Sequence, residues 1–462
     1  MFRNTRHIHL VAIGGIGMSG IAEVLLNLGF TVSGSDLHLS PVTERLASLG
    51  ATIYGGHDGT HVAGADVVVR SSAVTEANSE VTAARQQRIP VIRRAEMLAE
   101  LMRLKYGIAV AGSHGKTTTT TLVAAVLAAG GLDPTVIVGG RIKAMGTNAV
   151  LGGGQYLLAE ADESDGTFLH LTPTVAVVTN IDYEHVDFYA DMDSLRTAFA
   201  DFLQSVPFYG ACVLCSDDPE VRGLLPGLDR KIITYGFGPG AEVRADLGTV
   251  ATGDFGQEAV VWAFGQELGP IRLLMRGEHN LLNALAAVAV GLELGLEFKD
   301  IAAGLADSQG VGRRLESHGE PDGVLVIDDY GHHPTEVLAT LKVARSHERP
   351  VAVLFQPHRY SRTERFAREF ADALAAADAV GLLPVYAAGE SPPPGVDSAL
   401  LAGHLAEKGL ANVTLLDDAD AVPAWLDAVV TPGSLLLTLG AGDIGRRVED
   451  ICRHLRARSD GR

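Results

Sequence analysis

Residues 107–121 read GIAVAGSHGKTTTTT, and this stretch contains the pattern most informative about fold and function. The apolar run 108–111 predicts a buried strand, and the segment 118–132, which carries no charge and no Pro, predicts a buried helix. A glycine loop, residues 112–117, joins the two. Because backbone N–H groups and the dipole of a helix N-terminus attract anions, this combination predicts a phosphate-binding loop.

The loop is shorter than the usual phosphate-binding motif, G-x-x-x-x-G-K-[ST]. Val110 occupies the position of the first Gly, so the sequence offers G-x-x-G-K-T. In this context Lys116 is expected to reach the β- and γ-phosphates, and the Thr117 hydroxyl to hold Mg²⁺. An ordinary strand-to-helix turn with a chance Lys is the alternative. We predict a site for ATP or another nucleotide triphosphate.

The composition indicates sizeable hydrophobic cores and an acidic surface. With 462 residues, a prior of about 150 residues per domain suggests three domains. The formal net charge of −19 argues against nucleic acid or an anionic membrane as a partner. The sequence shows no signal-peptide pattern and no strongly apolar span of about 18 residues, so we expect no leader and no membrane insertion.

The cysteines favour a structural role. Cys212 and Cys215 form a C-x-x-C motif, but no second pair completes a zinc site. The segment 211–218 predicts a strand, in which side chains three positions apart point to opposite faces. We therefore expect structural thiols in a reducing cytoplasm.

The first hundred residues alternate between strand and helix patterns, which predicts a doubly wound α/β sheet. Expected strands lie at 8–13, 31–35 and 66–70, and expected helices at 18–28 and 44–49.

The loop 14–20 contains G-x-G-x-x-G and resembles a dinucleotide fingerprint, with Asp36 as the acidic ribose partner. Residues 440–445 match the same pattern, so the pattern alone is weak. We interpret the first loop as a nucleotide-diphosphate site, with packing alone as the alternative, and the second as a tight turn.

Polar clusters follow the predicted strands of the middle of the chain. Residues 156–159 lead into Glu160, Asp162 and Glu163, and residues 175–178 lead into a segment that ends at His185. Ligands bind outside the carboxyl ends of parallel strands, and carboxylate oxygens suit Mg²⁺. We expect a metal site beside the glycine loop; a solvated acidic loop is the alternative.

Other parts of the middle region are expected to be less regular. We expect a linker at 101–107, an irregular stretch at 208–275 and a long helix at 280–294.

The last part of the chain repeats this arrangement, with strands expected at 324–327, 351–355 and 434–439. The pair Arg313-Arg314 either neutralises a transferring phosphoryl group or forms a basic linker rim. Adjacent histidines point in different directions, so we expect His332-His333 to hydrogen-bond a substrate rather than zinc. Arg359 and Arg362 form either a clamp for a carboxylate or phosphate or a basic surface turn.

Taken in order, these blocks resemble the Mur ligase family of bacterial cell-wall synthesis. No single block is specific, but together they span nearly the whole chain. They are GGIGMSGIA at 14–22, SGSD at 33–36, GSHGKTTTT at 112–120, AEADESDGTFL at 159–169, TNIDYEH at 179–185, GEHNLLNALAA at 277–287, GVGRRLE at 310–316, DDYGHHPTE at 328–336 and QPHRYSRT at 356–363. The short phosphate loop is the family's own form. Ser113 stands where Thr is more usual, and Leu315 where Phe is common.

The resemblance implies an α/β protein of three domains. Residues 1–103 would form an N-terminal Rossmann-like domain that binds the UDP part of the substrate. Residues 104–314 would form a central P-loop ATPase domain with a mainly parallel sheet. Residues 315–462 would form a C-terminal Rossmann-like domain that receives the amino acid.

The resemblance also implies residue roles, position by position. The catalytic residues would be Lys116, Glu160, His185, Arg314 and Asp329. The Mg²⁺ ligands would be Thr117, Glu160 and His185, with the contributions of Asp162 and Glu163 open. The residues that hold ATP would be Gly112, Ser113, His114, Gly115, Lys116, Thr117, Thr118, Asn280, Asn283, Arg314 and Asp329. The residues that hold the other substrates would be Gly15, Gly17, Asp36, His57, Ser71, Thr147, Asn148, Tyr330, His332, Arg359 and Arg362.

The implied activity is that of an ATP-dependent ligase with Mg²⁺ as cofactor. It would join L-alanine to the lactyl carboxylate of UDP-N-acetylmuramate through an acyl phosphate, in a cytoplasmic monomer or weak homodimer. A tripeptide-recycling ligase is the nearest alternative, but those enzymes tend toward Phe-Ala at the positions of Tyr330-Gly331. A nicotinamide dehydrogenase and a non-catalytic nucleotide-binding regulator are the alternatives from other classes.

Overall fold

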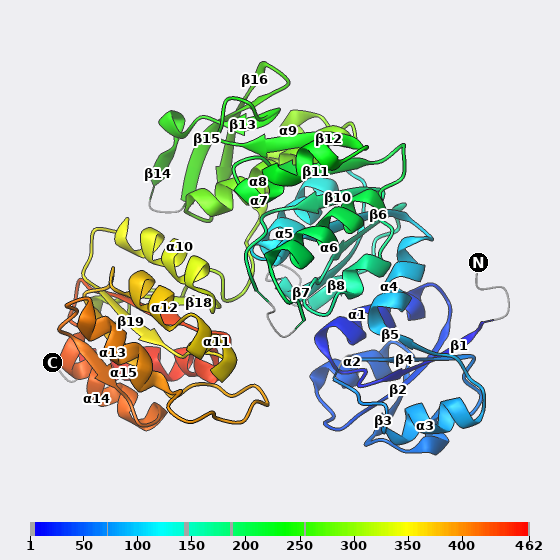
Figure 1. Ribbon diagram of the computed structural model, residues 1–462, viewed down its shortest axis with the longest axis horizontal. Helices are drawn as coiled ribbons and strands as arrows, with labels where there is room; N and C mark the ends of the chain where they lie inside the picture. The colour runs from blue at the N-terminus through cyan, green and yellow to red at the C-terminus, as the bar shows by residue number, and fades with distance from the viewer. Residues whose placement is uncertain (1–4, 72, 143–146, 185–187, 254–255, 461–462) are drawn as a thin grey trace. The chain divides into compact units, whose positions relative to one another are not determined.

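The computed structural model describes residues 5–71, 73–142, 147–184, 188–253 and 256–460, without the side chains of 16, 139–142, 147–149 and 460. The chain divides into two compact units, Met1–Val311 and Gly312–Arg462. The first unit holds two sheets and the second holds one (Figure 1). None of the helices in the described part of the chain combines the length and hydropathy that a bilayer-spanning helix needs.

The first sheet is parallel throughout, with the strand order β3-β2-β1-β4-β5. Its strands are β1 (His7–Val11), β2 (Thr31–Asp36), β3 (Thr52–Gly55), β4 (Val67–Arg70) and β5 (Val91–Arg93). Its helices are α1 (Ile16–Asn27), α2 (Pro41–Ser48), α3 (Ser79–Gln86) and α4 (Arg94–Met102). The predicted doubly wound arrangement is confirmed. The strand order reverses between β1 and β4, the point at which such sheets bind ligands.

The expected linker at 101–107 is shorter than predicted. Helix α4 continues to Met102, and β6 (Tyr106–Ala111) begins four residues later. Leu101 and Met102 are buried in the same hydrophobic cluster as Phe168 of the short helix η2 (Thr167–His170). These apolar side chains are part of the core, so only residues 103–105 connect the packed helix to β6.

The second sheet is mainly parallel, as predicted, and has the order β14-β15-β13-β12-β11-β10-β6-β9-β7-β8, with β16 paired to β15. The parallel part runs from β13 to β7, and antiparallel strands continue it at both ends. Besides β6, its strands up to β10 are β7 (Thr135–Ile142), β8 (Thr147–Val150), β9 (Tyr156–Glu160) and β10 (Val175–Val178). Its helices are α5 (Lys116–Ala129), α6 (Met192–Gln204), α7 (Pro219–Leu224), α8 (Glu278–Glu293) and α9 (Phe298–Asp307).

The expectation of an irregular stretch at 208–275 is wrong. This part of the chain contains β11 (Ala211–Cys215), β12 (Lys231–Gly236), β13 (Val243–Ala245), β14 (Ala251–Gly253), β15 (Gly256–Ala263) and β16 (Gln266–Leu273). Phe264 and Gly265, both with positive φ, close the tight hairpin between β15 and β16. A Phe in this conformation is not a usual hairpin signal, and Gly269 and Pro270 interrupt the strand pattern of β16.

Strand β11 carries its two cysteines on opposite faces, as predicted. Cys212 packs in the hydrophobic cluster that includes Phe199 of α6, whereas Cys215 packs in the cluster that includes Leu285 of α8. Both thiols and that of Cys452 are free and buried. The three cysteines are therefore core residues.

The second unit contains one sheet with the order β17-β18-β22-β19-β20-β21, parallel except for β17. Its strands are β17 (Glu316–Ser317), β18 (Leu325–Asp329), β19 (Val351–Phe355), β20 (Ala379–Leu382), β21 (Val413–Leu415) and β22 (Leu435–Leu439). Its helices are α10 (Pro334–Arg345), α11 (Tyr360–Arg365), α12 (Ala367–Leu374), α13 (Ser398–Glu407), α14 (Val422–Val429) and α15 (Val448–Asp460). Separate hydrophobic clusters cover this sheet, and the predicted Rossmann-like fold is confirmed.

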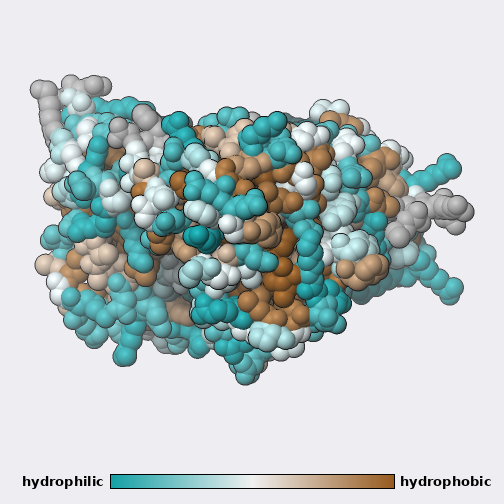
Figure 2. Space-filling view, turned by 90° about the horizontal axis from the view of Figure 1, so that it is seen from above, coloured by the Kyte–Doolittle hydropathy of each residue, from teal (hydrophilic) through white to brown (hydrophobic). Residues whose placement is uncertain are grey.

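Burial in the first unit predicts that two Phe→Ala substitutions change the free energy of unfolding by different amounts. Phe199 is fully buried and meets Phe168 edge to face at 5.4 Å, so Phe199→Ala should reduce the free energy of unfolding by about 3–5 kcal/mol. Apolar side chains also occur on the surface (Figure 2), and Phe208 is 92% exposed. Phe208→Ala should change stability by less than about 0.5 kcal/mol. Urea unfolding measures both values, and equal losses would contradict this assignment of the core.

Candidate active site

At two positions of the glycine loop, the backbone adopts a positive φ that favours glycine. It connects the end of β6 at Ala111 to the start of α5 at Lys116. Gly112 has φ of 130° and Gly115 has φ of 81°. A Cβ on Gly112 would overlap Thr179 Oγ1, and one on Gly115 would lie 2.6 Å from Asn283 Oδ1. The loop therefore keeps its shape only with glycine at both positions.

The segment after β10 holds the glycine loop in place. Thr179 Oγ1 donates to the carbonyl of His114 at 2.6 Å, and the His114 N–H donates to Asn180 Oδ1 at 2.8 Å. The Ser113 N–H donates to the Asn180 carbonyl at 3.0 Å, and Ser113 Oγ accepts from the Asp182 N–H at 2.8 Å. The polar residues predicted at this strand end thus fix the conformation of the loop.

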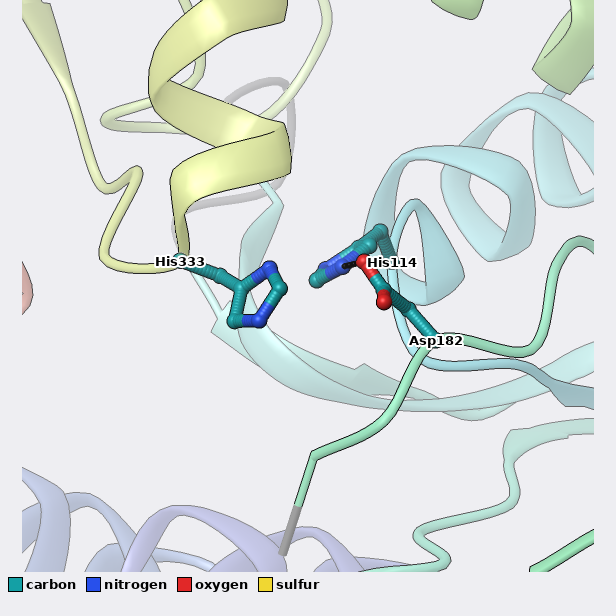
Figure 3. A group of neighbouring side chains, drawn as sticks. All are labelled: His114, Asp182 and His333. Carbon is teal, nitrogen blue, oxygen red and sulfur yellow. Dashed lines mark hydrogen bonds and ion pairs between the residues drawn. The ribbon is translucent and has the colours of Figure 1, made fainter. Parts of the chain in front are cut away.

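The side chains of His114 in this loop and Asp182 after β10 are within hydrogen-bonding distance. His114 Nε2 and Asp182 Oδ2 are 3.1 Å apart, and Figure 3 shows the imidazole facing the carboxylate. His333, drawn in the same view, belongs to the second unit. There it is buried and packs edge to face on Phe366, with ring centroids 4.9 Å apart.

Lys116 lies across the glycine loop. Its ammonium donates to Glu163 Oε1 and Oε2 at 2.8 and 2.9 Å and to the carbonyls of Gly112 and Ser113 at 2.5 and 3.2 Å. Burial alone would lower the pKa of Lys116, but Glu163, with Asp162 and Glu184, outweighs it and raises the pKa. The lysine therefore keeps its positive charge at the position where a phosphate would bind.

An acidic cluster surrounds this lysine. Glu163 is fully buried, and the Tyr189 hydroxyl donates to its carbonyl at 2.8 Å. Desolvation would raise the pKa of Asp162, but the charge of Lys116 and hydrogen bonds from Ser164 lower it.

The nearest strand end also carries a carboxylate. Glu160 is the last residue of β9 and pairs in register with Val110 of β6, the strand that leads into the loop. This strand end therefore offers carboxylate oxygens beside the loop, a type of donor that fits Mg²⁺. His185 lies outside the described residues.

The start of α8 supplies a buried amide pair next to the loop. Asn280 and Asn283 are both buried, and Asn283 Oδ1 accepts from Thr119 Oγ1 at 3.1 Å. Asn280 Nδ2 donates to the Arg276 carbonyl at 2.8 Å. The contact with Thr119 places Asn283, one of the two predicted adenine-contacting residues, against the first turn of α5.

The predicted UDP-site residues follow the carboxyl ends of successive strands in the first sheet. Gly15 and Gly17 follow β1, Asp36 ends β2, His57 follows β3, and Ser71 follows β4. This common edge is where parallel sheets bind ligands.

Asp36 also anchors the first glycine loop, because its Oδ2 accepts from the Gly14 N–H at 2.9 Å. Thr147 and Asn148 begin β8, but their side chains lie outside the described residues.

In the second unit, the partly buried Glu336 and the buried Asp329 hold the segment that carries Arg314. Arg314 Nη1 donates to Glu336 Oε1 at 3.1 Å. Asp329 accepts from the N–H groups of Leu315 and Gly331 at 2.8 and 2.7 Å. Burial raises the pKa of Asp329 to about 6, although the charge of Arg314 acts in the opposite direction.

A ring cluster lies next to these acids. The His332 ring packs edge to face on both Tyr330 and His358, with centroids 5.3 and 5.9 Å apart. His358 stacks on Tyr386, and its Nδ1 is 3.4 Å from Arg362 Nη1. The predicted residues of the amino-acid surface are thus close together within this unit.

Arg359 occupies an unusual backbone conformation beside an acid from a distant loop. Its φ is 69°, and its Nη1 lies 3.8 Å from Glu390 Oε1. Glu390 also accepts from the Ser361 N–H and hydroxyl at 3.0 and 2.7 Å. The loop that carries Glu390 therefore helps to shape this surface.

The second glycine loop, residues 440–445, is held from both sides by side chains. Arg313 donates to the Gly440 carbonyl at 2.5 Å and to Asp328 Oδ2 at 2.9 Å. Gln356 Nε2 donates to Asp443 Oδ1 at 2.7 Å, and Gln356 Oε1 accepts from the Ile444 N–H at 3.1 Å. These contacts support the interpretation of this loop as a tight turn. They also give Arg313 a structural role that differs from that of Arg314.

Sequence reasoning missed two charged residues of these sites. Arg94 lies against the first glycine loop, since its Cδ is 3.0 Å from where a Cβ on Gly17 would be. It directly follows β5, a strand of three residues that is too short to show a periodic pattern. Glu336 lies one turn into α10 and holds both Arg314 and the His332 N–H. Its place within DDYGHHPTE was the available signal.

The fold and the site define an α/β nucleotide-binding protein with a glycine–lysine phosphate loop. Family models match the chain in three consecutive parts: "Mur ligase family, catalytic domain" at residues 7–106, "Mur ligase middle domain" at 110–291 and "Mur ligase, glutamate ligase domain" at 313–442. The chain belongs to the Mur ligase family.

Relatives and a solved structure match over nearly the full length. A UDP-N-acetylmuramate–L-alanine ligase of Desulfosudis oleivorans is 52% identical over 453 residues, 98% of this chain and 99% of that protein. A protein of the same name from Acidithiobacillus ferrooxidans is 54% identical over 451 residues, 95% of this chain and 96% of that protein. The crystal structure of a UDP-N-acetylmuramate–alanine ligase from Thermotoga maritima has a TM-score of 0.80 at 28% identity, covering 99% of this chain and 100% of that one.

The geometry of the phosphate loop predicts that it tolerates no side chain at Gly112. Gly112→Ala combines a strained φ with overlap at Thr179, which should weaken ATP binding by about 5- to 150-fold. Gly223→Ala in α7 is the matched control, because nothing lies within 4 Å of its Cβ position. Titration calorimetry with ATP measures both affinities. Unchanged binding by Gly112→Ala would contradict the role of the loop.

The environment of His358 predicts acid sensitivity of the second unit. Burial, with the charges of His332, Arg362 and Arg359, lowers the pKa of His358 from 6.5 to about 4. The folded state favours the neutral ring. The contribution of His358 to the free energy of unfolding is therefore complete above pH 6.5 and is lost as the pH falls through 4. The free energy of unfolding should fall by at most about 3 kcal/mol over this range.

Calorimetric unfolding of His358→Gln should lack this part of the pH dependence. His454→Gln is the control, because His454 lies on α15 and pairs with Asp427 at the surface. Identical pH profiles for wild type and His358→Gln would show that the assignment is incorrect.

Proposed function

We propose that this chain joins L-alanine to the lactyl carboxylate of UDP-N-acetylmuramate with conversion of ATP to ADP and phosphate, in peptidoglycan precursor synthesis. The observation that carries the proposal is the charged Lys116 on a glycine loop, with Glu163 against it and Glu160 at the next strand end. The names of relatives at 52 and 54% identity supply the substrates.

The chemistry explains why a nucleotide triphosphate is needed. A carboxylate is a poor acyl donor, because its oxygen is a poor leaving group. Transfer of the γ-phosphoryl group of ATP to that oxygen gives an acyl phosphate and releases ADP. The amine of L-alanine then attacks the carbonyl carbon, the C–O bond to phosphate breaks, and the amine loses a proton. Phosphate leaves and an amide remains.

In this proposal the loop residues stabilise the charge of the transferring phosphoryl group. The loop 112–118 binds the phosphates with the N–H groups at the start of α5, residues 116–118, and the Lys116 ammonium binds the γ-phosphate in place of its contacts with Glu163. Asn280 and Asn283 contact the adenine from α8. Arg314 and Asp329 are also assigned to holding ATP.

Mg²⁺ is the metal that fits the oxygen donors beside the loop. Thr117 and Glu160 would hold it together with His185, and Asp162 or Glu163 would assist. When bound, the ion would neutralise charge on the phosphate oxygens.

The other substrates are assigned to the two Rossmann-like parts of the chain. Residues 1–103 bind the uridine diphosphate through Gly15, Gly17, Asp36, His57 and Ser71, and Thr147 and Asn148 of the central domain, residues 104–314, contact the sugar. Residues 315–462 receive the amino acid and the muramoyl end. The residues assigned to that surface are Tyr330, His332, Arg359 and Arg362.

The reaction takes place in the cytoplasm in this proposal, in a monomer or weak homodimer. The three buried, free thiols agree with a reducing compartment.

The nearest rival is a ligase that adds a recycled tripeptide to the same nucleotide sugar. Tyr330-Gly331 in DDYGHHPTE favours alanine, because the recycling enzymes tend toward Phe-Ala at these positions. The full-length relatives named as alanine ligases favour the same conclusion.

A substrate panel tests the proposal. Phosphate release is measured with ATP, Mg²⁺ and UDP-N-acetylmuramate in the presence of L-alanine, L-serine, glycine or the tripeptide. We expect release with L-alanine at a kcat/KM at least about tenfold above that with the tripeptide. Release with the tripeptide alone would favour the recycling ligase, and release with none of them would contradict the proposed function.

The position of Arg362 predicts that its substitution raises the KM for one substrate selectively. Its guanidinium lies beside His358 on the proposed amino-acid surface, so Arg362→Ala should raise the KM for L-alanine by about tenfold or more and change the KM for ATP little. Arg368→Ala on α12 is the control, because that side chain is exposed. Equal increases in both KM values for Arg362→Ala would count against its assignment.

A further inference from the structure

A buried polar layer lies on one face of the N-terminal sheet. His9 of β1 is in register with Ser33 of β2, and Ser35 lies two residues further along the same face. The short helix η1 (Gly59–Val62) and α3 supply His61 and Glu80 to this layer. Buried layers between a parallel sheet and its helices are usually apolar, so this layer is unusual.

Glu80 is the centre of the layer. Its side chain is fully buried, and its Oε2 accepts from Ser35 Oγ at 2.5 Å and from His57 Nδ1 at 3.2 Å. Its Oε1 accepts from His61 Nδ1 at 2.7 Å and lies 3.8 Å from His9 Nε2. Burial alone would raise the pKa of Glu80, but these hydrogen bonds lower it to about 2.

A buried carboxylate with this many polar partners is not explained by stability alone. Replacing a buried ionic group and its partners by packed hydrophobic residues is often neutral or stabilising. The mechanism proposed above does not use Glu80. The contacts of Glu80 therefore point to a second role for it.

His57 connects this layer to the ligand-binding edge of the sheet. It follows the carboxyl end of β3, and its side chain is 16% exposed. The Ser35 hydroxyl gives its hydrogen to Glu80, so both neighbours of His57 Nδ1 are acceptors, and Nδ1 must carry a proton. Nε2 then lies on the side of the ring turned away from Glu80.

We propose that Glu80 is a positioning residue for the uridine diphosphate part of the substrate, acting through His57. With Ser35, it fixes the tautomer and the orientation of the His57 ring, so that Nε2 is presented to the nucleotide at the carboxyl edge of the sheet. This inference rests on the proposed function, because it takes that edge as the nucleotide site.

Binding of UDP to the full chain tests the inference, with ATP binding as the internal comparison. Glu80→Gln keeps the shape of the side chain but removes its charge and one acceptor. It should weaken UDP binding by about tenfold or more and leave ATP binding within about twofold. Glu23→Gln is the matched control, because Glu23 forms an ion pair with Arg45 in the same domain, and it should bind UDP as wild type does.

A double-mutant cycle separates positioning from a structural role. If Glu80 acts through His57, the Glu80→Gln/His57→Asn variant should bind UDP no more weakly than His57→Asn alone. Ser35→Ala, which removes the bridging hydroxyl and keeps the carboxylate, should weaken UDP binding at least about threefold, and it provides the test if Glu80→Gln does not fold.

The outcomes distinguish this inference from the proposed function. A wild-type chain that binds no UDP would contradict the proposed function itself. Wild-type UDP binding that is unaffected by Glu80→Gln and Ser35→Ala would overturn only the role of Glu80, as would additive losses in the double variant.

Discussion

The ion pair between Lys116 and Glu163 is the interaction on which the rest of the proposed site depends. The ammonium is held between a fully buried carboxylate and two carbonyls of its own loop. A buried charge is stable only when it is paired and hydrogen-bonded, so the loop, the acidic cluster and the end of β10 must be positioned together. In the proposed reaction, a phosphate oxygen takes the place of Glu163 as partner of the lysine.

The same physical rule recurs at the other two proposed substrate sites. In the second unit, the carboxyl of Asp329 is buried against Arg314 and two backbone N–H groups. In the N-terminal domain, Glu80 is buried among His9, His57, His61 and Ser35. Each sheet therefore carries a buried acid that fixes the polar side chains next to it. Side chains fixed in this way lose less conformational freedom when a ligand binds.

The sequence predicted the parts of the fold that show clear periodicity, and it failed where elements are short or strained. The strands that lead into the glycine loops and the helices α5 and α8 were expected close to their observed bounds. Strand β5 and the hairpin closed by Phe264 were missed, because three residues show no alternation and Phe rarely adopts a positive φ. Helix α4 was mistaken in part for a linker, because the burial of Leu101 and Met102 depends on a tertiary partner, Phe168.

For the predicted sites, the sequence indicated the location of the polar residues but not their contacts with one another. The polar residues expected after strands do lie at the carboxyl edges of the sheets, since the carboxyl ends of parallel strands share an edge. The hydrogen-bond partners of Glu336, Glu390 and Glu80 could not be predicted, because only tertiary packing brings these acids next to their partners.

The most direct test of the central claim is a single-turnover measurement of ligation with ATP, UDP-N-acetylmuramate and L-alanine. Lys116→Ala and Glu163→Gln are compared after circular dichroism has shown that both variants are folded. We predict that Lys116→Ala loses at least about 10³-fold in rate, because the ammonium stabilises the transferring phosphoryl group. Glu163→Gln should lose rate to a smaller extent, because it keeps the ammonium but removes the carboxylate that holds it. A near-normal rate for folded Lys116→Ala would contradict the mechanism.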